Sequence, residues 1–442
     1  METILITIFC FGYLAITLEH SLKIDKLIPA LAMMAILWAI VALTHIPVFE
    51  VDAEMKKLVP SHIDEILLHH LGKTAEILIF LLGAMTIVEI IDYFNGFYTI
   101  KSFIKTKSKR KLLWIFSFLA FILSAIIDNL TATIVLITIL QKVIKDRNTR
   151  LWFSGLIVVS ANAGGAWSPI GDVTTTMLWI GNKVSTIKLI TYLFIPSLIC
   201  MLVPIGIASQ FKVFKGETII DKDDSEVKVH KYGATMLYLG LSGIIFVPIF
   251  KTLTHLPPYV GMMFSLSVIA GFAEIFSHTK ISISSVNEES EFKEHESPVH
   301  KSLSKIEFPS ILFFLGILLA VAALESIGLL FEFAGFLNET IPNTDIVIIL
   351  LGIFSAIIDN VPLVAASMGM FSNLIDDPLW HFIAFSAGTG GSMLIIGSAA
   401  GVVAMGMEKI NFFWYLKKIS VLAFIGFISG SITFILLRGI IV

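Results

Sequence analysis

The sequence predicts an all-α polytopic membrane protein of two inverted repeats, with re-entrant hairpins, discontinuous helices and about ten spans plus two hairpins. Three observations predict this fold class: apolar segments recur along the whole chain, two of them are too long for one span, and one motif occurs twice. Hydrophobic residues make up 56% of the 442 residues and charged residues 15%, whereas soluble domains carry roughly 25% charged residues. The bilayer is therefore expected to surround most of the fold.

The apolar segments divide into ordinary spans and two exceptions. Those at 112–141 and 345–375 exceed the ~20 residues that a helix needs to cross the hydrocarbon layer, and each contains an Asp-Asn pair near its middle. The segments lie at residues 2–18, 27–44, 74–96, 112–141, 151–182, 188–211, 233–252, 258–277, 308–331, 345–375, 379–406 and 419–438.

Basic residues flank the first long segment on both sides, and loops rich in Lys and Arg are typical of the cytoplasmic side. Both ends of 112–141 are therefore expected in the cytoplasm, which predicts a re-entrant hairpin with Asp128 and Asn129 at its tip. Acidic residues flank 345–375, which favours a periplasmic origin for the second hairpin. The basic residues are Lys101, Lys105, Lys107, Lys109, Arg110 and Lys111 before the first hairpin, and Lys142, Lys145, Arg147 and Arg150 after it.

An internal repeat relates the two halves of the chain. The motif Ser-Ala-Ile-Ile-Asp-Asn occupies residues 124–129 and again residues 355–360. Downstream, Ser-Ala-Asn-Ala-Gly-Gly at 160–165 corresponds to Ser-Ala-Gly-Thr-Gly-Gly at 386–391. Matched landmarks in the same order indicate duplication, and the opposite charge of the flanks indicates that one copy is inverted. Inverted repeats with broken helices are typical of secondary transporters.

Glycines are expected to break one helix in each repeat, because an intact helix has no backbone groups to offer a substrate. Freed carbonyls near mid-membrane can replace the hydration shell of a cation. The breaking residues are Gly164, Gly165, Pro169 and Gly171 in the first repeat, and Gly388, Gly390, Gly391 and Gly397 in the second.

The repeats suggest a division of the chain into five parts, with a charged, Ser-rich linker between the halves. Between Pro47 and Gly72 we expect an interfacial helix on the periplasmic face. Glu89 and Asp92 are expected to be solvated near the membrane surface. The parts are N-terminal scaffold spans with the periplasmic interfacial segment (1–72), a first transport repeat (73–211), connecting scaffold spans (212–277), a cytoplasmic linker (278–306) and a second inverted transport repeat (307–442).

Asp128 is the leading candidate for an ion-binding or proton-binding residue. It lies deep in an apolar run without a basic neighbour, where an uncompensated carboxylate costs several kcal/mol. The alternative is a protonated Asp that only caps the hairpin. Asp359 occupies the matching tip, although Pro362 follows it where Thr131 follows Asp128.

Asp172 follows the break in the first discontinuous helix, and its counterpart in the second repeat is Ser398. This asymmetry predicts a cation closer to the first repeat. Neutral side-chain oxygens nearby are of the hard kind that Na⁺ prefers, although threonines at such positions also serve as caps. The neutral candidates are Asn129, Asn162, Thr174, Thr175 and Asn360, with Ser124, Ser355, Gly164, Gly165, Gly390, Gly391 and Ser398 in supporting positions.

The paired Ser-Ala-Ile-Ile-Asp-Asn motifs and the long motif at 160–176 resemble the NhaD-type sodium/proton antiporters of the ion transporter superfamily, over nearly the whole chain. The resemblance implies expulsion of Na⁺, and often Li⁺, in exchange for H⁺, by a homodimer in the bacterial inner membrane, with no cofactor and no nucleic-acid partner. The important polar positions that it implies are Ser124, Asp128, Asn129, Asn162, Asp172, Thr174, Thr175, Ser355, Asp359 and Asn360.

The mechanism that these residues suggest is competition. Asp128 and Asp172 bind either a partly dehydrated Na⁺ or protons, but not both at once, since a bound cation favours the ionised carboxylate. The hairpins and broken helices would move against a scaffold made by the spans at 2–44 and 233–277.

Two other functions stay open. A sodium-coupled carboxylate or arsenite carrier of the same superfamily would share the architecture, but a carboxylate at each hairpin tip repels an anion unless Na⁺ is recruited first. An intramembrane aspartyl protease also needs two embedded aspartates. However, the sequence around Asp172 lacks the first glycine of the Gly-x-Gly-Asp pattern, and an inverted duplication is typical of a transporter rather than an enzyme.

Overall fold

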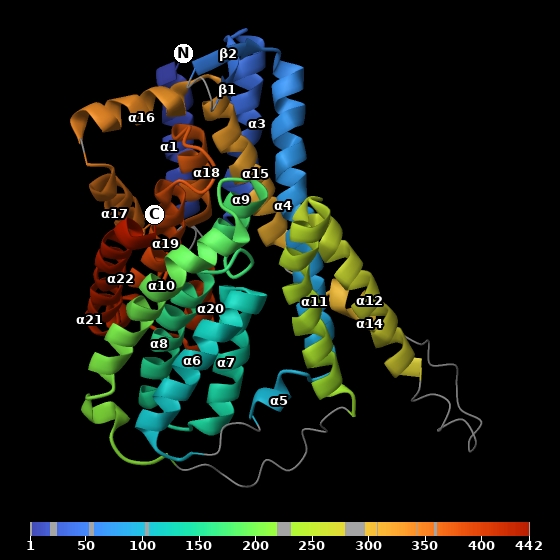
Figure 1. Ribbon diagram of the computed structural model, residues 1–442, viewed down its shortest axis with the longest axis vertical. Coiled ribbons are helices and arrows are strands. Elements are labelled where there is room, and N and C mark those ends of the chain that lie inside the picture. Colours follow the sequence, from blue (N-terminus) through green and yellow to red (C-terminus); the bar gives the residue numbers. More distant parts are fainter. Residues whose placement is uncertain are drawn as a thin grey trace.

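The computed structural model describes residues 2–17, 24–52, 57–101, 106–218, 231–278, 297–306, 308–341, 343–357 and 360–441, and Figure 1 shows their arrangement. The first half contains α1 (Glu2–Thr17), α3 (Leu27–Leu43), β1 (Val48–Asp52), β2 (Lys57–Ser61), α4 (Ile63–Tyr93), α5 (Tyr98–Lys101), α6 (Lys109–Ile127), α7 (Asn129–Val143), α8 (Arg147–Gly165), α9 (Val173–Ile180), α10 (Thr186–Ala208) and η1 (Lys212–Phe214). The second half contains α11 (Gly233–Thr254), α12 (Pro258–His278), α14 (Pro298–Leu303), α15 (Phe308–Ser326), α16 (Leu329–Thr340), α17 (Thr344–Phe354), α18 (Asn360–Met370), α19 (Pro378–Gly390), η2 (Gly391–Met393), α20 (Ala399–Glu408), α21 (Phe412–Lys418) and α22 (Ser420–Ile441).

Apolar helices dominate the fold, which confirms the predicted all-α membrane protein. Among the described residues, seven helices are long and apolar enough to cross a membrane: α4, α6, α10, α11, α12, α15 and α22. Shorter apolar helices, including α1, α3, α7, α17, α18 and α20, supply the rest of the expected segments. The long predicted segments are each divided into two helices, which is why they exceed the length of one span.

The helix breaks lie where the sequence places them. The chain reverses between α6 and α7 at Asp128, and these two helices pack against each other as a hairpin (Figure 1). α8 ends at Gly165 and α9 begins at Val173. In the second repeat α19 ends at Gly390, and α20 begins only after η2. The predicted discontinuous helices are therefore present in both repeats.

The predicted interfacial helix between Pro47 and Gly72 is wrong for most of its length. β1 and β2 pair antiparallel, with Val48 opposite Ser61, and α4 begins already at Ile63. The prolines at 47 and 60 disfavour a helix interior, and the Val-rich stretches between them favour extended backbone. α16 was not expected either, and it lies at the upper left of the molecule in Figure 1.

The helices form two packed groups. α1, α3, α4, α11, α12 and α15 pack with one another, and we call them the scaffold group. The other group, which we call the hairpin group, contains α6, α7, α8, α9, α10, α17, α18, α19, α20 and α22 (Figure 1). α4 and α15 lie in the scaffold group, although the sequence boundaries 73–211 and 307–442 assign them to the transport repeats. Much of the expected linker, 279–296, lies outside the described residues.

Basic residues of both repeats meet at one end of the molecule, which we call the basic end. Arg110 Nε donates to the carbonyl of Ser209 at 2.8 Å. Arg150 forms an ion pair of 3.1 Å with Glu408, whose side chain is only 1% exposed. The first contact joins the start of α6 to the end of α10, and the second joins the start of α8 to the end of α20 in the second repeat.

Candidate ion-binding site

A cavity of about 240 Å³ lies between the hairpin group and the scaffold group. The tip of the first hairpin, the start of α9 and the start of α18 bring Asp128, Asp172 and Asn360 to it, which are three of the residues that the sequence singled out. Apolar residues of α4, α11, α12 and α20 supply much of the remaining wall, such as Phe80, Ala84, Ile244, Met262 and Val402. The two carboxylates therefore line the same cavity.

Asp128 is held in a strained turn at the start of α7. Its φ is +94°, a region that non-glycine residues seldom adopt. Its Oδ1 accepts from the Thr131 backbone N–H at 2.7 Å, and its Oδ2 accepts from the Thr131 hydroxyl at 2.9 Å. The cap predicted as the alternative role is therefore present, and the same carboxylate also lines the cavity.

Asp172 is the point where both repeats meet. Its side chain is buried and caps α9, with Oδ1 accepting from the Thr174 backbone N–H at 2.9 Å and from the Thr174 hydroxyl at 2.8 Å. Asn129 Nδ2 donates to Oδ2 at 2.5 Å. Asn360 Nδ2, from the other repeat, lies 3.4 Å from both oxygens. Donors converge on this carboxylate from both hairpin tips.

Asn162 extends this network across the repeat boundary. Its Oδ1 accepts from Asn129 Nδ2 at 3.3 Å, and its own Nδ2 donates to the Ser398 hydroxyl at 3.1 Å. Ser398 caps α20 by accepting from the backbone N–H of Gly401. All of these side chains are buried, which makes the network a rigid polar element at the centre of the hairpin group.

The threonines after Asp172 bond to backbone and carboxylate oxygens. The Thr175 hydroxyl donates to the Asp172 carbonyl at 2.9 Å, and the Thr176 hydroxyl donates to the Asp172 and Pro169 carbonyls at 3.0 Å each. In this conformation Thr174 and Thr175 stabilise the break, which is the capping alternative considered for them.

The supporting serines and glycines join the hairpins to the broken helices. Ser124 Oγ donates to the Ala161 carbonyl at 2.6 Å, and Ser355 Oγ donates to the Ala387 carbonyl at 2.8 Å. A Cβ added at Gly164 would lie 2.2 Å from the Phe121 carbonyl oxygen, and one at Gly390 would lie 2.0 Å from that of Gly352. Gly165 and Gly391 make similar backbone contacts, with Gly171 and Gly397. Each hairpin therefore lies against its broken helix at a distance that only glycine permits.

Two residues remain to be placed relative to the site, Asp359 and Lys26. Asp359 lies outside the described residues. Lys26, at the start of α3, lines the cavity, with its ammonium 4.4 Å from the centre of the Phe313 ring. No motif pointed to Lys26, because it comes from a segment far from the repeats in sequence. Buried carboxylates, amides and a break in the backbone are the groups that bind a partly dehydrated monovalent cation.

Comparison with known proteins identifies the relatives of this chain. Residues 13–380 match the CitMHS family, described as a citrate transporter. Sodium/proton antiporter 2 of Arabidopsis thaliana is 40% identical over 97% of this chain and 98% of its own length. The Na⁺/H⁺ antiporter NhaD of Vibrio cholerae is 31% identical over 98% of this chain and 91% of its own length.

A solved structure supports the fold. The crystal structure of the Alcanivorax borkumensis YdaH transporter, reported to have an unusual topology, matches with a TM-score of 0.57. The match covers 94% of this chain and 98% of that chain at 12% identity. The shared feature is therefore the polytopic helical architecture.

Proposed function

Because the chain belongs to the family of NhaD-type sodium/proton antiporters, we propose that it exchanges Na⁺ for H⁺ across the membrane at the cavity between its two helix groups. The observation that carries the proposal is the pair of carboxylates, Asp128 and Asp172, in one cavity of about 240 Å³. Donors from both hairpin tips hold the second carboxylate in place.

Exchange follows from competition for these oxygens. A Na⁺ ion at Asp128 and Asp172 favours their ionised forms, so protons leave as the ion binds. Protons arriving from the other side convert the carboxylate oxygens from ligands into donors and release the ion. Since the same atoms serve both cations, one cycle moves them in opposite directions.

The amides orient the site. The Nδ2 atoms of Asn129 and Asn360 donate to Asp172, which leaves their amide oxygens as the groups available for a cation. Because the Asn129 amide also bonds Asn162, a change at the first hairpin tip reaches the second repeat through Ser398.

The finer assignments form part of the same proposal. The basic end faces the cytoplasm, in keeping with the positive-inside rule, and the chain lies in a bacterial inner membrane as a homodimer. Li⁺, which has the same charge and prefers the same hard oxygen ligands, is a second substrate.

The test is fluorescence of a pH-sensitive dye in everted vesicles energised by respiration, to which NaCl, LiCl or KCl is added. Wild-type protein is expected to dequench the dye with Na⁺ and Li⁺. Asp128→Asn is expected to remove this response, because the amide keeps the cap but cannot exchange a proton at this site.

Asp64→Asn is the matched control, since Asp64 is an exposed residue of the first turn of α4. It is expected to behave as wild type. A full sodium response from correctly inserted Asp128→Asn would contradict the assignment of the site, and silence of wild-type protein to all three cations would contradict antiport.

A second candidate is a sodium-coupled carrier of carboxylates such as citrate. Two observations favour it: the description of the matching family, and Lys26 in the cavity wall, where an ammonium can pair with an anion. Uptake of labelled citrate in the same vesicles, dependent on Na⁺ and lost in Lys26→Gln, would establish it in place of antiport.

A further inference from the structure

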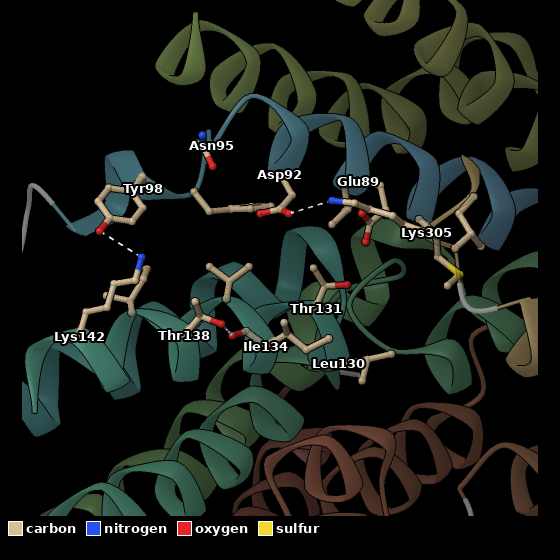
Figure 2. A pocket seen from close by; sticks show the side chains of 16 residues that line it. Glu89, Asp92, Asn95, Tyr98, Leu130, Thr131, Ile134, Thr138, Lys142 and Lys305 are labelled. Atoms are coloured by element: carbon tan, nitrogen blue, oxygen red, sulfur yellow. Dashed lines mark hydrogen bonds and ion pairs between the residues drawn. The ribbon is translucent and has the colours of Figure 1, made fainter. Parts of the chain in front are cut away.

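A second cavity, of about 350 Å³, lies between α4 and α7 and connects the basic end with the ion site. Figure 2 shows Glu89 and Asp92 on the α4 side, Thr131, Thr138 and Lys142 on the α7 side, and Lys305 reaching in from the segment before α15. Polar side chains lie on both sides of the cavity, among apolar residues such as Val88, Ile134 and Ile139, whereas lipid-facing surfaces are apolar throughout.

Thr131 separates the two cavities. It lines both of them, as do Met85 and Leu130. Its hydroxyl donates to Asp128 Oδ2 at 2.9 Å and its backbone N–H donates to Oδ1 at 2.7 Å. An ion that reaches the inner end of the second cavity is thus one side chain away from the Asp128 carboxylate.

The outer part of the cavity opens at the surface of the molecule. The Asp92 and Lys305 side chains are 57% and 49% exposed, and their charged atoms are 3.9 Å apart. Lys142 donates to the Tyr98 hydroxyl at 3.1 Å (Figure 2). Both lysines of the cavity wall therefore have an acidic or aromatic partner. The Lys305 ammonium already occupies a position beside the Asp92 carboxylate, where a mobile cation could also lie.

The residues of α7 that face the cavity include accessible ones. Ile134 is half-buried and Thr138 is exposed on the face toward the cavity, whereas Ala132, Leu136, Ile137 and Leu140 on the other faces are buried. α7 thus presents one accessible stripe that runs from the basic end to the hairpin tip.

We propose that this cavity is the water-filled path by which a hydrated monovalent cation travels between the cytoplasm and Asp128. The proposal rests on the proposed function for the identity of the ion. Glu89 and Asp92 attract the cation into the path, Lys305 is displaced from Asp92 as it enters, and Thr131 forms the inner end.

Single cysteines test the path, because a charged reagent that cannot cross the membrane modifies only thiols in water. The starting protein carries Cys10→Ala and Cys200→Ala, which removes both native cysteines. Ile134→Cys, on the path, is compared with Ile122→Cys. Ile122 is 47% exposed on α6, lines neither cavity described above, and like Ile134 lies six residues from Asp128.

The reagent is a trimethylammonium methanethiosulfonate, added to the cytoplasmic face and followed by the mass of the protein. The thiol of the Ile134→Cys variant is expected to react roughly tenfold faster than the thiol of the Ile122→Cys variant. It is also expected to react more slowly in NaCl than in choline chloride, and its modification is expected to stop sodium-evoked dequenching. Thr138→Cys and Phe118→Cys are the second pair, ten residues from the same aspartate, for use if Ile134→Cys does not insert.

Equal labelling of the two variants of a pair, or modification of the Ile134→Cys variant without loss of exchange, would overturn the path. Because labelling is read by mass, it does not depend on transport. Unequal labelling in a protein that shows no sodium response would keep the path and contradict the proposed antiport instead.

Discussion

The two repeats share a framework but not a chemistry. In both, a serine of the hairpin donates to the carbonyl of an alanine in the broken helix, and a glycine three residues after that alanine lies against a hairpin carbonyl. The residue that caps the second half of the broken helix is Asp172 in the first repeat and Ser398 in the second. Duplication therefore supplied the architecture twice, but a carboxylate caps the broken helix in the first repeat only.

This difference shows how a symmetric fold can hold one ion. Asp172 receives Asn129 from its own repeat and Asn360 from the other, whereas Ser398 receives Asn162. Each cap therefore accepts an amide from the opposite repeat. The second repeat contributes a hydrogen-bond donor, Asn360, and a matching framework, and the first repeat contributes the Asp172 carboxylate.

The largest expected effect tests the shared framework. Gly164→Ala and Gly390→Ala each place a methyl group within 2.2 Å of a carbonyl oxygen, so each is expected to lower the free energy of unfolding by about 3 kcal/mol or more. The yield and melting temperature of the detergent-purified protein measure the effect.

Gly206→Ala and Gly406→Ala are matched controls in helices α10 and α20, because a Cβ at either position has no atom within 4 Å. They are expected to be neutral or slightly stabilising. If only one of the two framework glycines were sensitive, the repeats would not share this contact in the folded protein.

The sequence was sufficient to predict the framework because repeats are visible within one chain. The identical motifs at 124–129 and 355–360 located the first hairpin and the boundary between α17 and α18, and glycines located both breaks. The contacts between repeats were not predictable in this way. Asn360 at Asp172 and Lys26 in the cavity wall depend on how segments more than 100 residues apart pack together, and no periodicity records that packing.

The β-hairpin and the packing of α4 and α15 with the scaffold spans were missed for a different reason. Mixed polar segments near a membrane surface fit an interfacial helix and a short hairpin about equally well, and here the prolines and valines favoured the second. α4 resembles a transport-repeat helix in sequence position, but its 31 residues pack against α11, α12 and α15.

The next effect tests the difference between the repeats. Asp172→Ser makes the first break resemble the second and is expected to reduce sodium-evoked proton release to below roughly a tenth of wild type, because the intramembrane carboxylate is lost. Asp172→Asn keeps an oxygen to accept from the Thr174 N–H and is expected to lose exchange equally, which separates the charge from the cap.

Ser398→Ala is the corresponding change in the second repeat, and it is expected to keep exchange within about twofold of wild type, since only one neutral hydrogen-bond acceptor is lost. Dye fluorescence in vesicles, normalised to the amount of inserted protein, measures all three variants. Equal losses from Asp172→Asn and Ser398→Ala would mean that the two breaks contribute alike, and the site would then lie on the symmetry axis.

The smallest expected effect comes from Ser124 and Ser355, and it separates their contribution to stability from their contribution to ion exchange. Ser124→Ala and Ser355→Ala each remove a buried side-chain hydrogen bond to a helix carbonyl, at Ala161 and Ala387, and each is expected to cost about 1 kcal/mol. The melting temperatures should therefore fall by similar amounts, while Ser267→Ala, at an exposed serine of α12, should leave the melting temperature unchanged.

Exchange should fall further in Ser124→Ala, because the carbonyl of Ser124 lies against Gly171, next to the Asp172 carboxylate. Similar melting temperatures with unequal exchange would place the chemistry in the first repeat, whereas equal losses in both measurements would leave Ser124 a purely structural residue.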